Sequence, residues 1–134
     1  PNSQVPAPNT SAVDWPGGKA GDVVLVEFSL DGQQMQALNG GPYALFNEAV
    51  SLSVPCPDQI ELDRLWFALL ADGGEEMQGG WLKDRFGLRW QLVPEPFEQM
   101  MREADEAQSK RLMAAMMEMV KLDLAALRRA WEGG

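Results

Sequence analysis

Histidine is absent from this 134-residue chain, and cysteine and tyrosine occur once each. Histidine titrates near neutral pH and is the commonest metal ligand. Its absence excludes Ser–His and Cys–His nucleophile pairs and every metal centre that needs imidazole. A single cysteine allows no internal disulfide, which fits a reducing compartment. We interpret Cys56, which lies between two prolines, as a partly buried filler, because no histidine is present to activate it.

Positive charge is also scarce: 11 Lys and Arg stand against 20 Asp and Glu, a net charge of -9. Such a chain repels phosphate backbones, so we expect no nucleic-acid partner. No apolar run approaches the roughly 20 residues that cross a bilayer, and residues 1–15 show no signal-peptide pattern. We therefore expect a cytoplasmic protein without a membrane partner. Because the chain begins without methionine, we also expect a segment upstream.

Alternating hydrophobicity predicts most of the secondary structure in the first two thirds of the chain. Asp31-Gly32 is a hairpin signal, and Asp84 to Gly87 is a predicted tight turn. Strands are predicted over residues 22–30, 33–39, 46–54, 75–83 (one or two, interrupted by Gly79-Gly80) and 88–93.

Capping residues predict the helices. Asp58 with Glu61 opens a helix that Gly73-Gly74 ends. Residues 95–134 are predicted to be helical: a short turn near 95–102, a helix capped by Asp105 and a final helix capped by Asp123. The apolar stripe of the middle helix is Leu112, Met116 and Val120. The order of elements makes the chain α+β and forms a βαβββ unit, preceded by a hairpin that looks like the end of a second such unit.

Four segments carry a resemblance to a known family. They are VEFSLDGQQMQALNGGP, FNEAVSLSVPCPDQIELDRLW, GGWLKDRFGLRWQLVP and RLMAAMMEMVKLDLAAL. They resemble the PhnB-like family, also labelled 3-demethylubiquinone-9 3-methyltransferase domains. This family belongs to the glyoxalase/bleomycin resistance/dioxygenase superfamily, also called vicinal oxygen chelate.

The resemblance implies a fold, a division of the chain and an oligomeric state. Two βαβββ modules of the glyoxalase-like fold would form a cupped mixed sheet, with C-terminal helices added and the first module lacking its initial strand and helix. Residues 1–134 would be a single glyoxalase-like domain: 1–45 the remainder of the first module, 46–94 the second module and 95–134 the C-terminal helices. Two chains would pair as a homodimer.

In the superfamily, the cup usually holds a divalent metal between His, Gln and Glu side chains. The resemblance places these positions at Gln91, near Gln36 and near Ala49, with a fourth on the missing strand. Two neutral amides and an alanine are poor ligands for a divalent ion, so we expect neither a metal nor another cofactor. Glu27 is the one nearby carboxylate and the one candidate base, and no catalytic residue is assigned.

Without a metal, the cup would bind a small polar organic molecule through amides and charges. The predicted ligand-binding residues are Gln36, Asn39, Gln91, Glu27 and Arg89. Arg89 would pair with an anionic group. The alternatives to ligand binding are that Gln91 forms hydrogen bonds with backbone groups of the sheet and that Arg89 faces solvent.

Two other functions stay open. One is a methyltransferase, as the family label states, although a usual S-adenosylmethionine site needs a glycine-rich loop in a parallel sheet. The other is a non-catalytic, ligand-sequestering protein of the bleomycin-resistance type, with Trp81 or Trp90 stacking on a planar ligand. Whether the protein is an enzyme is left undecided.

Overall fold

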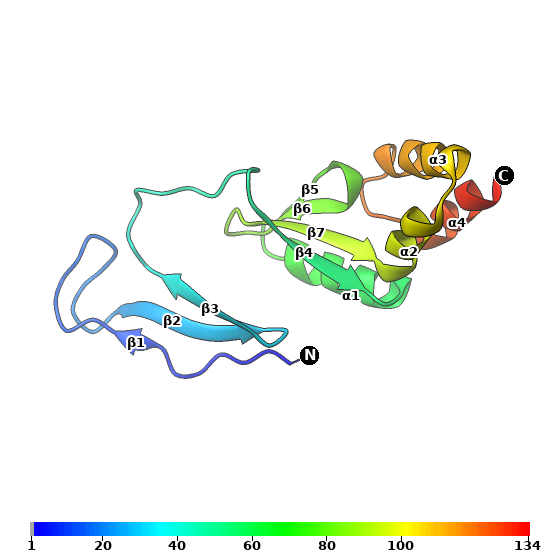
Figure 1. The fold of residues 1–134 in the computed structure, drawn as a ribbon. Coiled ribbons are helices and arrows are strands. Elements are labelled where there is room, and N and C mark those ends of the chain that lie inside the picture. The colour runs from blue at the N-terminus through cyan, green and yellow to red at the C-terminus, as the bar shows by residue number, and fades with distance from the viewer. Residues whose placement is uncertain (1) are drawn as a thin grey trace. The chain divides into compact units, whose positions relative to one another are not determined.

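The computed structural model describes residues 2–134, which form two compact units, Pro1–Leu45 and Phe46–Gly134. The first unit carries a three-stranded sheet, and the second carries a four-stranded sheet with four α-helices (Figure 1). The predicted α+β class is confirmed, and so are the helices at the C-terminus. Each unit is described separately below.

The N-terminal unit is an antiparallel sheet in the order β1-β2-β3. Its strands are β1 (Asn9–Thr10), β2 (Val23–Leu30) and β3 (Gln33–Leu38). The predicted hairpin is confirmed: Asp31 and Gly32 both adopt positive φ, at 48° and 77°. A two-residue turn of this kind matches the twist of the flanking strands, and Asp-Gly tolerates it well.

The two faces of the β2–β3 hairpin differ in polarity. Cross-strand partners share a face, so Glu27 with Gln36 and Ser29 with Gln34 form a polar face. Phe28 with Met35 lies on the opposite, apolar face. No side chain in residues 2–50 is fully buried, so this apolar face remains partly exposed.

The C-terminal unit begins with the predicted βαβββ order, which is confirmed. Its elements are β4 (Ser51–Cys56), α1 (Gln59–Leu70), β5 (Glu75–Glu76), a 3₁₀ turn (Gln78–Gly80), β6 (Trp81–Lys83) and β7 (Arg89–Pro94). The sheet order is β4-β7-β6-β5, with β4 parallel to β7 and the other pairs antiparallel.

The strand predicted to begin at Phe46 begins instead at Ser51, five residues later. The Asn47 side chain accepts a hydrogen bond from the Ala49 N–H at 2.9 Å, and this local turn competes with strand pairing. The strand also ends later than predicted, at Cys56, because β7 offers partners up to Pro94. Pro55 is tolerated since β4 is an edge strand.

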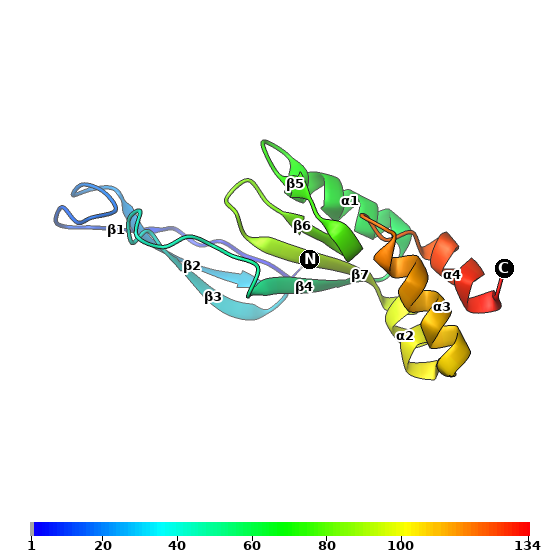
Figure 2. The same cartoon turned by 90° about the horizontal axis from the view of Figure 1, so that it is seen from above.

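Helix α1 covers one face of this sheet (Figure 2). The Asp58 side chain accepts from the Glu61 N–H at 2.8 Å, which confirms the predicted cap. Two residues of this helix, Leu62 and Trp66, are fully buried in the core. The opposite face of the sheet carries Trp81 and a group of polar side chains, namely Ser51, Ser53, Lys83, Arg89 and Gln91.

Three helices complete the chain: α2 (Glu95–Glu103), α3 (Glu106–Met117) and α4 (Leu124–Glu132). The predicted caps at Asp105 and Asp123 are confirmed. The predicted short turn near 95–102 is a full helix, because its residue Phe97 packs into the core. Val120 lies outside α3, in a turn where its carbonyl accepts from the Gly80 N–H at 2.7 Å.

The hydrophobic core lies in the C-terminal unit. Ten apolar side chains are buried among the described residues, and all belong to residues 56–127. They join β4, β6, β7 and α1 to the C-terminal helices. None of the helices in residues 2–134 has the length and apolar character needed to cross a bilayer.

Candidate ligand-binding site

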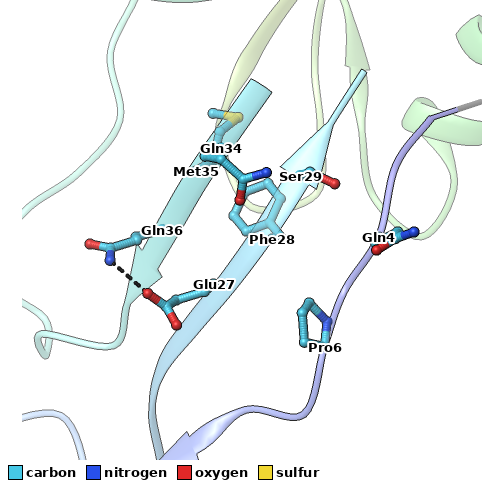
Figure 3. A pocket seen from close by; sticks show the side chains of 8 residues that line it. All are labelled: Gln4, Pro6, Glu27, Phe28, Ser29, Gln34, Met35 and Gln36. Atoms are coloured by element: carbon cyan, nitrogen blue, oxygen red, sulfur yellow. Dashed lines mark hydrogen bonds between the residues drawn. The ribbon is translucent and has the colours of Figure 1, made fainter. Parts of the chain in front are cut away.

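A hollow of about 580 Å³ lies in the N-terminal unit (Figure 3). It is lined by Gln4, Pro6, Glu27, Phe28, Ser29, Gln34, Met35 and Gln36. Two of the predicted ligand-binding residues, Glu27 and Gln36, are brought together here. The size is within the usual range for small-molecule pockets.

The hollow exists because the N-terminal segment is hydrogen-bonded to β2 along only part of its length. Gln4 exchanges two backbone hydrogen bonds with Ser29, at 3.1 and 2.9 Å, and Asn9 pairs with Leu25. Pro6 and Pro8 lie between these contacts and have no N–H to donate. The ladder is therefore interrupted opposite the middle of β2.

The interruption leaves the backbone of Glu27 open toward the hollow. Alternate residues of an antiparallel strand point their backbone groups to opposite neighbours. The Val24 carbonyl accepts from Asn39 on the β3 side, whereas Ser29 bonds to Gln4. Glu27 has the parity of Ser29, and within residues 2–134 no backbone hydrogen bond joins it to residues 5–8. The hollow thus offers a backbone donor and acceptor beside a carboxylate.

Glu27 and Gln36 form the polar centre of this surface. The Gln36 Nε2 donates to Glu27 Oε1 at 3.1 Å, as the dashed line in Figure 3 shows. No Lys or Arg among the described residues forms an ion pair with Glu27. The second carboxylate oxygen and the Gln36 carbonyl oxygen therefore have no partner in this pair and can accept from a ligand.

Three polar residues of the hollow were not among the predicted ligand-binding residues. Ser29 and Gln34 could have been found, because the hairpin register places them on the same face as Glu27. Gln4 could not, since only the folded chain brings the N-terminal segment beside β2. The lining also includes three apolar residues, namely Pro6 and, from the opposite face of the hairpin, Phe28 and Met35.

Asn39, also predicted to bind ligand, holds the N-terminal unit together. Its Nδ2 donates to the carbonyls of Gly17, at 3.3 Å, and Val23, at 3.2 Å. The backbone carbonyl of Asn39 accepts a hydrogen bond from the Trp15 Nε1 at 2.6 Å. Both amide hydrogens are used, and Asn39 does not line the hollow.

The remaining two predicted residues, Gln91 and Arg89, lie in the C-terminal unit on the polar face of its sheet. Gln91 Nε2 donates to the Ser51 hydroxyl at 2.7 Å. Arg89 Nη1 donates to the carbonyls of Gly87, at 2.7 Å, and Phe46, at 3.3 Å. Arg89 Nη2 donates to Glu48 at 2.7 Å. Gln91 therefore satisfies a side chain of the neighbouring strand rather than the backbone.

The residues that the resemblance places at the superfamily's metal positions do not fit a divalent ion. Gln36 and Gln91 are neutral amides whose Nε2 groups already bond to Glu27 and Ser51. Ala49, in the coil before β4, has no donor atom on its side chain. Within residues 2–134, no three His, Cys, Asp or Glu side chains are grouped as metal ligands. We derive no chemistry through a metal here.

The two tryptophans predicted to stack on a ligand differ in their surroundings. Trp90 Nε1 donates to Asp84 Oδ2 at 2.9 Å, and its ring packs against the core. Asp84 also accepts from the backbone N–H groups of Phe86 and Leu88, which builds the predicted turn before β7. Trp81 lies on the polar face, paired with Gln91 across the strands.

We expect the thiol of Cys56 to be inert in the folded protein. The side chain is fully buried, and burial, followed by the charges of Glu61 and Glu95, raises its pKa to about 11. The thiolate is the reactive form, and at pH 7.5 it would be below about one part in a thousand. Iodoacetamide should therefore label Cys56 only after denaturation, as mass spectrometry would show. Rapid labelling of the native protein would contradict this.

The fold is that of an α+β protein with two mainly antiparallel sheets, and its N-terminal unit contains a hollow of small-molecule size. The chain belongs to the 3-demethylubiquinone-9 3-methyltransferase family, whose model matches residues 1–93. The match includes both sheets and ends before α2. The predicted PhnB-like resemblance is confirmed, and the fold is consistent with the predicted superfamily.

The chain is also similar to two solved structures. The chain is 26% identical to a putative 3-demethylubiquinone-9 3-methyltransferase, PhnB protein, from Bacillus cereus, with a TM-score of 0.59 over 69% of this chain and 79% of that one. Protein PA1353 from Pseudomonas aeruginosa is 20% identical, with a TM-score of 0.55 over 69% and 78%. The second likeness shows the fold alone. No curated protein matches the chain.

Proposed function

We propose that this protein binds a small polar organic molecule in the hollow of its N-terminal unit, without a metal. The observation that carries the proposal is the pair Glu27–Gln36, which faces a hollow of about 580 Å³. The open backbone groups of Glu27 support it, because they add a donor and an acceptor. A ligand that itself carries both, such as a carboxamide, complements this set.

A screen of small polar fragments by ligand-observed NMR tests the proposal. Glu27→Ala and Gln36→Ala should each weaken a bound fragment at least tenfold, the loss expected when a hydrogen bond to a charged or amide group in a pocket is removed. Gln33→Ala is the matched control, because Gln33 is exposed on the same strand as Gln36 but does not line the hollow. Fragments that bind both variants as tightly as the wild type would contradict the proposal.

Turnover decides between an enzyme and a sequestering protein. Release of a bound fragment in unchanged form would favour the sequestering protein. The family name refers to methyl transfer. The one parallel strand pair in residues 2–134, β4–β7, is connected through α1, β5 and β6, and no glycine-rich loop precedes the helix. We therefore do not propose methyl transfer for this chain.

The proposal includes a cytoplasmic homodimer. Self-association is supported by the partly exposed apolar face of the β2–β3 hairpin, since residues 2–50 contain no fully buried side chain. A reducing location is supported by the single cysteine, which allows no internal disulfide. Light scattering on the purified protein would measure the oligomeric state directly.

A further inference from the structure

Arg89 is held rigidly at the polar face of the four-stranded sheet. It is the first residue of β7, and its side chain is 12% exposed. Two backbone carbonyls, of Gly87 and Phe46, accept from Nη1 and fix the plane of the guanidinium. A pre-oriented guanidinium of this kind is suited to recognising planar anions.

The hydrogen bonds of this guanidinium are incomplete. Nη2 donates to Glu48 Oε1 at 2.7 Å, but Nε is buried and has no partner among the described residues. Nε and Nη2 lie on one edge of the group and together form a fork that matches the two oxygens of a carboxylate. Glu48 accepts from only one nitrogen of this fork, so the Arg89–Glu48 ion pair has one hydrogen bond fewer than a two-bond guanidinium–carboxylate pair.

Glu48 lies at an exposed position, from which its side chain can move away from Arg89. It belongs to the coil before β4, and its side chain is 65% exposed, against 12% for Arg89. The pKa of Glu48 is lowered by its own backbone N–H and then by the hydrogen bond and charge of Arg89, so it is ionised at neutral pH. Burial does little to hold it there.

The charges around Arg89 favour an anion once Glu48 is displaced. Lys83 lies close enough to lower the pKa of Glu48 as well, and it is paired with Glu75 at 2.9 Å. Two cations thus face two carboxylates, and release of Glu48 would leave one positive charge uncompensated. Gln91 and Ser51 extend the same face with an amide and a hydroxyl.

From this geometry we propose that Arg89 is a binding site for a small organic carboxylate, and that Glu48 occupies it as an internal substitute until the ligand arrives. The incoming carboxylate accepts from both Nε and Nη2, and Glu48 swings out into solvent. The site lies in the C-terminal unit and does not depend on the hollow of the N-terminal unit. Variants of Glu27 and Gln36 should therefore leave it unchanged.

The test is a titration of the full chain with malonate at constant ionic strength, followed through the ¹H–¹⁵N signal of the Arg89 Nε–H. We expect this signal to move with malonate but not with neutral malonamide. In Glu48→Gln the apparent Kd for malonate should fall about tenfold, as expected if Glu48 blocks the site about nine-tenths of the time. Malonate should also raise the melting temperature of this variant.

Two further variants make the result specific. Glu75→Gln removes a carboxylate from the same face that pairs with Lys83 and not with Arg89, so it should change the Kd less than twofold. Arg89→Lys keeps the charge but loses the fork, and when it is added to Glu48→Gln malonate should no longer raise the melting temperature. An equal gain in Glu75→Gln would overturn the proposal, as would an unmoved Nε–H signal in Glu48→Gln. Tighter binding of phosphate than of malonate would overturn the assignment to carboxylates.

Discussion

Replacing Trp66 with alanine is expected to lower the free energy of unfolding by about 3–5 kcal/mol, the range for a large aromatic side chain lost from a core. Trp66 is fully buried on α1 and is the largest side chain of the core. Its indole Nε1 also donates to Glu76 Oε1 at 2.9 Å, which ties the helix to β5. The substitution removes this bond and leaves a cavity that neighbouring side chains cannot fill.

Urea denaturation followed by circular dichroism measures the effect, and the adjacent residue supplies a control. Phe67 follows Trp66 on the same helix, but its ring is 64% exposed. Phe67→Ala loses an exposed contact with the Lys121 ammonium, 5.2 Å from the ring, so it should cost no more than about 1 kcal/mol. Equal losses for the two variants would show that α1 does not cover the core as described.

Gly80→Ala should destabilise the protein by about 2–4 kcal/mol, combining left-handed backbone strain with overpacking. Gly80 has φ of +85°, and a Cβ there would lie 2.9 Å from Leu122 Cγ and 3.2 Å from the Leu92 carbonyl oxygen. Its N–H donates to Val120 at 2.7 Å, so the backbone cannot shift without losing that bond. The contact joins β6 and β7 to the turn between α3 and α4.

Gly79 separates the two contributions. It also has positive φ, +74°, but a Cβ there would meet nothing within 4 Å. Gly79→Ala should therefore show only the backbone cost of about 1–2 kcal/mol. Thermal and urea unfolding of both variants give the difference. If Gly79→Ala were as damaging as Gly80→Ala, packing against Leu122 would not be the cause.

Features set by neighbouring residues could be predicted well. The hairpin at Asp31-Gly32 and the caps at Asp58, Asp105 and Asp123 appear where the sequence places them. Each depends on hydrogen bonds or torsions within about four residues. Element boundaries without such a signal were less accurate, as the late start of β4 at Ser51 shows.

The candidate sites were harder to predict, because their partners are distant in the sequence. Gln36 and Glu27 could be paired through the hairpin, but Gln4 reaches the hollow only in the folded chain. The pairing of Glu48 with Arg89 could not be predicted, since nothing in the local sequence of Glu48 points to a residue 41 positions away. Asn39 was predicted to bind ligand, and the structure shows that its amide donates to the carbonyls of Gly17 and Val23, which are 22 and 16 residues away in the sequence.

Composition, periodicity and capping are local properties, and they were enough to predict the α+β class, the order of the elements and the absence of any imidazole chemistry. Tertiary structure alone decided which polar groups are satisfied and which stay open. The unpartnered Nε of Arg89 and the interrupted ladder beside Glu27 are of this second kind. Both arise from where distant segments run past one another, and this follows from the packing of the whole fold rather than from local preference.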